Sequence, residues 1–208
     1  MKQFLIWTSL IVAAAFAIWN MTKLATTSNQ ATVAEAKEIS ESDWVKGSRA
    51  AKVVLVEYSD LQCPACAYYA QTVESLAQEF GDQIAIVYRH FPLPQHKNAR
   101  LAAYAAEAAG RQGKFWEMIN RIFLNQKEWA SEENALSLFT DYAEKLNLNL
   151  EIFQTDLDSP NVKEVVENQY ASGIRFKVNG TPTFFLNGEK ISKPNELPDL
   201  IRQKLTNP

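Results

Sequence analysis

The sequence predicts an α/β fold in which a parallel β–α–β unit is followed by a block of helices, a β-hairpin and a closing helix. Two continuous apolar runs rich in β-branched residues, at residues 52–58 and 83–89, are typical of buried parallel strands. A helical pattern fills the interval between them, and long helical periodicity begins at about residue 95. Because neighbouring parallel strands need a crossover connection, the two strands and the helix between them are expected to form one unit.

The elements are expected in a definite order. The first strand leads into a helix that begins at Pro64 and ends before Gly81. Proline suits the first helical position, where its missing N–H group removes no hydrogen bond, and glycine commonly follows a helix. After the second strand, further helices are predicted at residues 99–110, 115–124 and 135–146 and from 159, then a strand at 183–186, a hairpin return at 189–192 and a helix at 195–205.

The N-terminus is predicted to be a separate segment. An apolar run extends from Phe4 to Trp19, between Lys2 and Lys23. Its length lies between that of a signal-peptide core and that of a full membrane span of about 20 residues. We interpret residues 1–21 as an uncleaved membrane anchor, because tryptophan prefers the membrane interface. A cleaved signal peptide is the alternative.

Residues 22–43 are small and polar without a sustained apolar stripe, and they predict a flexible tether. The domain proper is expected over residues 44–208, with a helical insertion at about 95–175. Both interpretations of the N-terminus place this domain outside the cytoplasm. The expected protein is a single-pass protein of the cell membrane with an extracytoplasmic catalytic domain, or a secreted or periplasmic protein after signal cleavage.

Composition narrows the function further. The chain has 208 residues, of which 47% are hydrophobic and 22% charged, which is ordinary for a packed domain. The formal net charge is −3, and no basic stripe interrupts the sequence. Nucleic-acid binding depends on such a stripe. The sequence therefore predicts no nucleic-acid partner.

The chemistry is predicted at Cys63 and Cys66, the two cysteines of the chain. Residues three apart at a helix start share a face, so the sulfurs can form a disulfide or lie side by side as thiols. Cys63 is expected to be exposed and Cys66 to lie one turn inside. The pair follows the carboxyl end of a strand and opens a helix, where α/β sheets place their sites and a thiolate is stabilised.

Two alternatives to a redox dithiol are open. A purely structural disulfide would close a loop of only about four residues, which stabilises a fold by roughly 2 kcal/mol in the chain-entropy estimate. A metal site needs about four ligands, but the nearest soft or imidazole candidates, His90 and His96, lie far downstream without ligand spacing. No metal or cofactor is therefore predicted.

Glu57 is a carboxylate inside an otherwise apolar strand. Burying it unpaired would cost several kcal/mol, so it is either a proton exchanger for Cys66 or a strand-end carboxylate that reaches water. His90 and His96 are interpreted as structural. Tyr68 is attributed to helix packing.

Five motifs, in order, resemble the DsbA-like disulfide oxidoreductases over roughly residues 44 to 206, especially the membrane-anchored Gram-positive type. The motifs are Glu57 six residues before the first cysteine, Cys63-Pro64-Ala65-Cys66, Arg89-His90-Phe91-Pro92, residues 112–116, and Gly180-Thr181-Pro182. The resemblance implies an α/β thioredoxin-like fold with a helical insertion.

The resemblance also implies residue roles. Cys63, Cys66 and Glu57 would be catalytic, with Cys63 the sulfur that exchanges and Cys66 the one that resolves. Pro64, Ala65, Thr181 and Pro182 would contact the substrate, with a cis peptide bond before Pro182. Ala65 stands where the best-known members carry histidine, so that only its backbone N–H group can stabilise the Cys63 thiolate.

The function implied is the introduction of disulfides into unfolded or folding exported proteins, with reoxidation by a quinone-linked membrane thiol oxidase. The same residues also suit a disulfide reductase or isomerase, because direction depends on the redox difference from the partners. A non-catalytic peptide-binding or chaperone module on the same fold is the third possibility.

Overall fold

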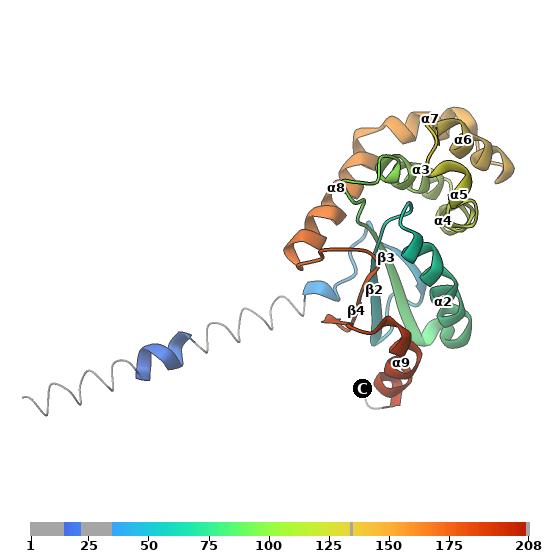
Figure 1. The fold of residues 1–208 in the computed structure, drawn as a ribbon. Helices are drawn as coiled ribbons and strands as arrows, with labels where there is room; N and C mark the ends of the chain where they lie inside the picture. Colours follow the sequence, from blue (N-terminus) through green and yellow to red (C-terminus); the bar gives the residue numbers. More distant parts are fainter. Residues whose placement is uncertain (1–14, 22–34, 134, 207–208) are drawn as a thin grey trace, which may run out of the picture.

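The computed structural model describes residues 15–21, 35–133 and 135–206 (Figure 1). The predicted N-terminal anchor lies largely outside the described residues; its residues 15–21 form a mostly exposed helical segment. No helix in the described part of the chain is long and apolar enough to cross a membrane. Residues 22–34 of the predicted tether also lie outside the described part.

A mixed sheet forms the centre of the domain. Within the described residues it has five strands in the order β1-β3-β2-β4-β5. Its central strands, β2 and β3, are parallel, and the other pairs are antiparallel. Every residue of β2, β3 and β4 is buried because both faces of the sheet are covered. The strands are β1 (Trp44–Gly47), β2 (Val53–Ser59), β3 (Ile84–His90), β4 (Thr183–Leu186) and β5 (Glu189–Lys190).

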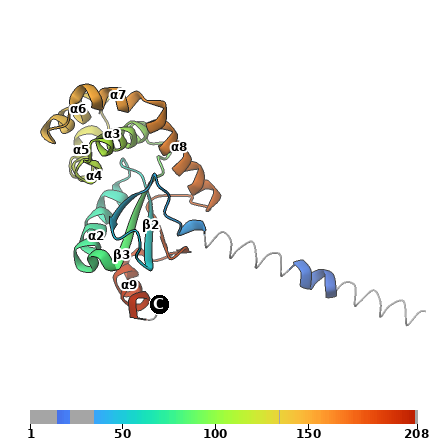
Figure 2. The same cartoon turned by 180° about the vertical axis from the view of Figure 1, so that it is seen from behind.

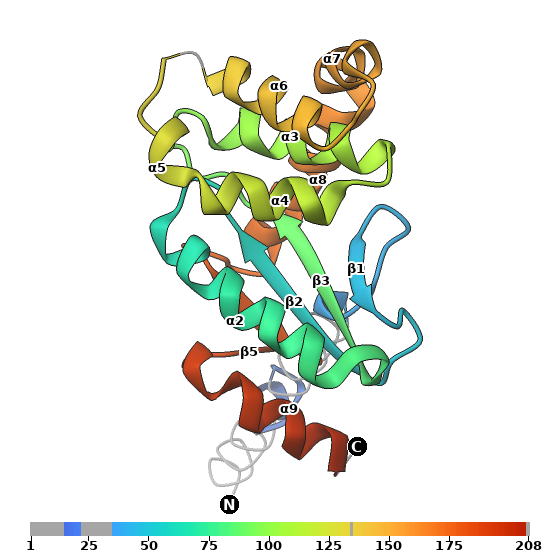
Figure 3. The ribbon, with the colours of Figure 1, turned by 90° about the vertical axis from the view of Figure 1, so that its right-hand side faces the viewer.

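The helices divide into two groups (Figures 1 and 2). Two of them, α2 and α9, cover one face of the sheet and share an apolar core with β2, β3 and β4. Helices α3 to α7 form a block at the carboxyl ends of β2 and β3 (Figure 3). Helix α8 runs from this block onto the other face of the sheet, where Tyr170 packs against the core of β2, β3 and β4. The helices are α2 (Pro64–Phe80), α3 (Ala99–Arg111), α4 (Phe115–Leu124), α5 (Gln126–Trp129), α6 (Ala135–Lys145), α7 (Leu150–Asp158), α8 (Pro160–Arg175) and α9 (Leu197–Thr206), with 3₁₀ turns at Gly81–Gln83 and Pro194–Glu196.

Local signals set the ends of several helices as expected. Pro64 opens α2, and Gly81 follows it with a positive φ of 50°. The Ser159 side chain accepts a hydrogen bond from the backbone N–H of Val162 at the start of α8, as N-cap residues do. The sequence did not predict β1, which adds an antiparallel edge to β3, or α7, whose N-cap is Asn149.

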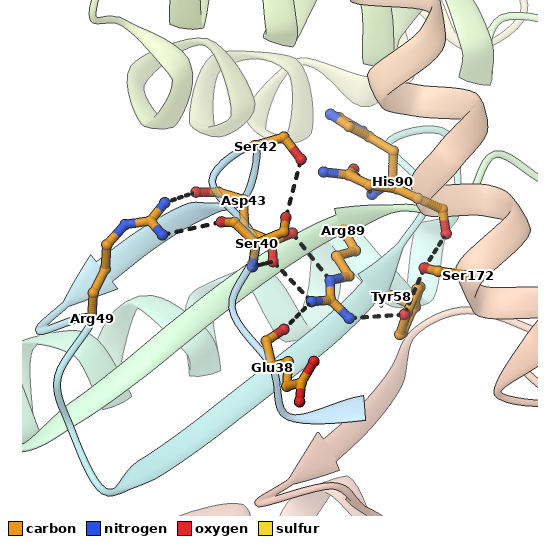
Figure 4. Close-up of polar contacts among 10 residues, drawn as sticks. Glu38, Ser40, Ser42, Asp43, Arg49, Tyr58, Arg89, His90 and Ser172 are labelled. Carbon is orange, nitrogen blue, oxygen red and sulfur yellow. Dashed lines mark hydrogen bonds and ion pairs between the residues drawn. The ribbon is translucent and has the colours of Figure 1, made fainter. Parts of the chain in front are cut away.

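Residues 35–43 differ from the predicted tether, because they pack against the domain (Figure 4). Arg89 of β3 is buried, and its Nη2 atom lies 2.8 Å from Asp43 Oδ2. The same Nη2 atom donates a hydrogen bond of 2.6 Å to the backbone oxygen of Glu38. A buried guanidinium needs such partners to offset its desolvation. The folded domain therefore begins before residue 44, the predicted boundary.

Candidate active site

The two cysteines lie where β2 gives way to α2, and both belong to the apolar core of the helical block. Cys63 is the N-cap residue of α2, and Pro64 occupies its first turn. Both sulfurs are free thiols. Cys66 is 0% exposed and Cys63 only 7%. Cys63 is thus more covered than predicted, because the helical block packs over this turn.

The loop before β4 approaches Cys63 from the other side. The Cys63 Sγ atom lies 3.4 Å from the backbone oxygen of Thr181, and the Thr181–Pro182 peptide bond is cis. The prediction of a cis bond is confirmed. Pro64 and Ala65 are exposed beside the sulfur, and Thr181 and Pro182 are half-buried. All four residues named as substrate contacts therefore surround Cys63.

The environment of Cys63 favours its thiolate. Its pKa is lowered from 9.0 to about 5, chiefly by a hydrogen bond from the Cys66 thiol. Burial opposes this effect, while the Thr181 hydroxyl and the backbone N–H groups of Ala65 and Cys66 add to it. Hydrogen bonds to the charged form lower the pKa of an acid. Ala65 contributes through its backbone, as the sequence suggested.

The environment of Cys66 does the opposite. Burial raises the pKa of its thiol far above the ordinary value, and the shared proton with Cys63 and the charge of Glu57 raise it further. The backbone N–H of Asp60 donates to its sulfur at 3.4 Å. At neutral pH the pair therefore holds one thiolate, on Cys63, and one thiol, on Cys66.

Glu57 lies behind this pair in the middle of the sheet. It sits in register between Tyr88 of β3 and Phe184 of β4 and is 3% exposed. The interpretation that this carboxylate reaches water is therefore wrong. Burial raises its pKa from 4.5 to about 7, and negative charge on Cys63 raises it further. Its Oε1 atom has no hydrogen-bond partner among the described residues.

Asp60 is a site residue that sequence reasoning missed. Its buried carboxylate accepts hydrogen bonds from the backbone N–H groups of Gln62 and Leu93, both at 2.7 Å. His96 Nδ1 lies 2.8 Å from the same carboxylate. These bonds hold the turn that presents Cys63. In the sequence, only the position of Asp60 directly after β2 could have indicated that it is a site residue.

Gln126 is a second residue that the sequence did not indicate. From α5 its Nε2 atom donates to the backbone oxygens of Leu61, at 2.8 Å, and Cys63, at 3.1 Å. Both bonds are buried and join segments 63 to 65 residues apart. Gln126 therefore fixes the dithiol turn to the helical block.

The histidines have structural partners. His90 Nε2 lies 3.1 Å from Glu107 Oε1, and this pair is buried. His96 pairs with Asp60. Among the described residues, no group of three or more His, Cys, Asp or Glu side chains is placed to hold a metal ion.

A family model described as thioredoxin matches residues 38–203. The chain belongs to the thioredoxin family. Among solved structures, the fold is similar to that of oxidised BdbD from Bacillus subtilis, with a TM-score of 0.71 and 23% identity, covering 80% of this chain and 94% of that one. Wolbachia pipientis alpha-DsbA1 gives a TM-score of 0.75 at 18% identity, covering 84% and 96%. The predicted DsbA-like thioredoxin fold with a helical insertion is confirmed.

Similar sequences also occur within much longer proteins. The Na(+)/H(+) antiporter NhaA of Herminiimonas arsenicoxydans is 38% identical over 151 residues, which are 73% of this chain and 23% of the antiporter. Na(+)/H(+) antiporter NhaA 1 of Mycolicibacterium gilvum is 35% identical over 167 residues, 78% of this chain and 26% of that protein. The chain spans about a quarter of the length of these curated relatives.

These findings correct one prediction. We expected a single-pass protein of the cell membrane with an extracytoplasmic domain, or a secreted or periplasmic protein. That localisation is wrong, because the similar sequences are segments of proteins named Na(+)/H(+) antiporters.

Proposed function

We propose that this protein is a thiol–disulfide oxidoreductase that passes a Cys63–Cys66 disulfide to cysteine pairs in unfolded or folding proteins. One observation carries the proposal: two sulfurs three residues apart have pKa values shifted in opposite directions, that of Cys63 down to about 5 and that of Cys66 far upward. Such a pair has one sulfur suited to leave or attack and one suited to hold a proton.

The lowered pKa of Cys63 favours the oxidising direction. A thiolate exists only in the reduced form, so whatever stabilises it shifts the equilibrium toward the dithiol and makes the disulfide a stronger oxidant. A Cys63 pKa near 5 in place of 9.0 stabilises the reduced protein by roughly 3 kcal/mol at pH 7, because each pKa unit below pH 9 and above the lower limit of pH 7 corresponds to about 1.4 kcal/mol. That corresponds to about 60 mV for a two-electron couple.

The reaction follows from the geometry. A client thiolate attacks Cys63, the Cys63–Cys66 bond breaks, and Cys66 leaves as a thiolate that takes up a proton. Glu57, with its pKa raised to about 7 by burial, is the adjacent acid. A second client thiolate then attacks the client sulfur of the mixed disulfide, and Cys63 leaves as the stabilised thiolate.

Thr181 and Pro182 would align the client. Pro182 has no backbone N–H group to compete for the Cys63 sulfur, and the backbone of Thr181 can pair with an extended client segment by strand addition. Pro64 and Ala65 follow Cys63 in the chain and are exposed. These four residues would form the substrate contacts nearest to the reacting atom.

The cycle requires an oxidant, and we assign this role to a quinone-linked membrane thiol oxidase, the class that the family resemblance implies. In that step the Cys63 thiolate attacks the partner disulfide. Glu57 accepts the Cys66 proton, and Cys66 displaces the partner from Cys63. Two electrons thereby pass to the partner.

The proposal is tested by mixing the oxidised protein with a reduced, unfolded client that has one cysteine pair. We expect one client disulfide to form for each Cys63–Cys66 disulfide consumed, as measured by mass spectrometry after alkylation. Cys63→Ser is the control and should transfer nothing. Absence of transfer, or reduction of an oxidised client by the reduced protein instead, would overturn the assigned direction.

A further inference from the structure

Asp60, the first residue after β2, contacts both cysteines through its backbone. Its N–H group donates to Cys66 Sγ at 3.4 Å, and its backbone oxygen accepts a hydrogen bond of 3.0 Å from the N–H group of Cys63. The bond to Cys66 lowers the pKa of that thiol, against the larger effect of burial. A hydrogen bond acts in this direction when it stabilises the charged form. The Asp60 N–H group is therefore placed to stabilise negative charge on Cys66.

The Asp60 side chain connects this backbone to the loop after β3. Strands β2 and β3 are parallel neighbours that end at the same edge of the sheet (Figure 3), so the segments that follow them lie side by side. The Asp60 carboxylate is 0% exposed and lies 2.8 Å from His96 Nδ1. It also accepts a hydrogen bond of 2.7 Å from the Leu93 N–H group. Because a carboxylate only accepts hydrogen bonds, Nδ1 of His96 is the donor.

His96 is itself held in place by its backbone. Its N–H group donates to the backbone oxygen of Leu93 at 3.0 Å, and its backbone oxygen accepts a hydrogen bond of 3.1 Å from the N–H group of Ala99, where α3 begins. The hydrogen bonds from Gln62 and Leu93 to the Asp60 carboxylate come from backbone N–H groups, which nearly every substitution keeps. The orientation of the carboxylate therefore depends on the identity of residue 96.

We propose that His96 is a positioning residue for disulfide transfer: by holding the Asp60 carboxylate, it keeps the Asp60 N–H group on the Cys66 sulfur while that sulfur leaves. This inference rests on the proposed function. In the first step a client thiolate bonds to Cys63, the Cys63–Cys66 bond breaks, and its electron pair goes to Cys66, which takes up a proton from Glu57. A thiol whose thiolate is better stabilised leaves faster. The effect is kinetic, because Cys66 is a thiolate only during this step and a thiol in the finished dithiol.

The test compares His96→Phe, which keeps a ring but removes the donor, with the wild-type protein. Each oxidised protein is mixed with a peptide that has one cysteine, and the mixed disulfide is followed by rapid acid quenching and mass spectrometry. We expect the rate constant of attack on the Cys63–Cys66 disulfide to fall about tenfold, because a hydrogen bond to a charged group is misplaced. The equilibrium constant with glutathione should stay within about twofold of the wild-type value, because the finished dithiol holds Cys66 as a thiol. A purely structural His96 would only lower the free energy of unfolding, and an unchanged rate constant would overturn the proposal.

Two further variants isolate the hydrogen bond. His96→Asn carries an amide N–H group on the atom that corresponds to Nδ1, and should recover most of the rate. Lys97→Ala is the matched control in the same loop, because Lys97 Nζ donates to the backbone oxygen of Ser131 and not to Asp60; it should leave the rate unchanged.

The outcomes separate this inference from the proposed function. A wild-type protein that forms no mixed disulfide with the peptide would overturn the proposed function. A wild-type rate in His96→Phe would overturn the role of His96 alone. If His96→Asn were as slow as His96→Phe and both shifted the glutathione equilibrium, a charge on the ring and not the hydrogen bond would act on the thiolates, and the positioning role would be wrong.

Discussion

Cys63, at the rim of the dithiol, and Cys66, in its interior, have surroundings that differ more than their separation of three residues suggests. At the rim, Cys63 accepts hydrogen bonds from the helix start and the Cys66 thiol, and its pKa falls to about 5. In the interior, Cys66 lies against Asp60 and Glu57, and burial raises its pKa. Identical side chains thus acquire opposite acidities from the backbone and the depth at which each is placed.

The largest effect should come from exchanging the two sulfurs for oxygen one at a time. Cys63→Ser should abolish disulfide transfer, because the sulfur that exchanges with the client is gone. Cys66→Ser should instead accumulate the mixed disulfide between Cys63 and the client, since no resolving thiol remains. Non-reducing electrophoresis with mass spectrometry distinguishes these outcomes. A trapped client on Cys66 in the Cys63→Ser protein would reverse the assignment of rim and interior.

The next largest effect concerns the proton of Cys66. Glu57→Gln should slow the step in which Cys66 attacks the mixed disulfide by about 100-fold, the lower range for loss of a general base. In the wild-type protein this rate should fall as the pH drops below about 7, where Glu57 becomes protonated, and Glu57→Gln should lose that inflection. Stopped-flow kinetics of this step measure both.

Glu107→Gln is the matched control, because Glu107 is a buried carboxyl that pairs with His90 and not with the sulfurs. It should keep the inflection near pH 7. An unchanged pH profile in Glu57→Gln would remove Glu57 from the proton path.

The Glu57 carboxyl should also make the free energy of unfolding depend on pH. Its pKa is raised from 4.5 in the unfolded chain to about 7 in the folded protein, so the folded state holds the proton more tightly and stability is lost as the pH rises from about 4.5 to 7. Glutamine carries no charge at any pH. Glu57→Gln should therefore be more stable than wild type at pH 8, by on the order of 3 kcal/mol, and about equal at pH 4. Urea denaturation at both values measures the difference, and an equal gain at pH 4 would contradict the assigned pKa.

The smallest effect should come from the Thr181 hydroxyl. Thr181→Val preserves the shape of the side chain but removes the hydroxyl that helps to lower the pKa of Cys63, and should raise that pKa by about one unit. Thr183→Val is the control in the same loop, since its hydroxyl bonds to Gly180 and not to the sulfur. Thiolate absorbance against pH gives both values. A larger shift in Thr183→Val would show that loop distortion, and not the hydroxyl, is measured.

The parts of the fold that local patterns predicted are those whose cause is local. The apolar runs of β2 and β3, the proline that opens α2 and the pattern before β4 were all visible in short windows. The packing of residues 35–43 was not, because it depends on the pair of Asp43 with Arg89, 46 residues away in the sequence. β1 was missed for the same reason, because its partner strand, β3, comes only after β2 and α2 in the sequence.

The candidate site divides in the same way. The spacing of Cys63 and Cys66 and the isolated carboxylate of Glu57 stand out in the sequence. Gln126 does not, because a glutamine in a polar stretch has no signature until α5 packs over the dithiol turn. Sequence can therefore name the reacting atoms, whereas the groups that hold them come from tertiary contacts.

The central claim is that the stabilised Cys63 thiolate makes this disulfide an oxidant. Equilibration of the protein with defined ratios of reduced and oxidised glutathione at pH 7, followed by acid quenching and mass spectrometry, measures its reduction potential directly. The account predicts a value less negative than about −200 mV, between those of protein disulfide isomerase and DsbA or close to them. A value near about −270 mV, that of thioredoxin, would mean that the protein is a reductant and would contradict the account.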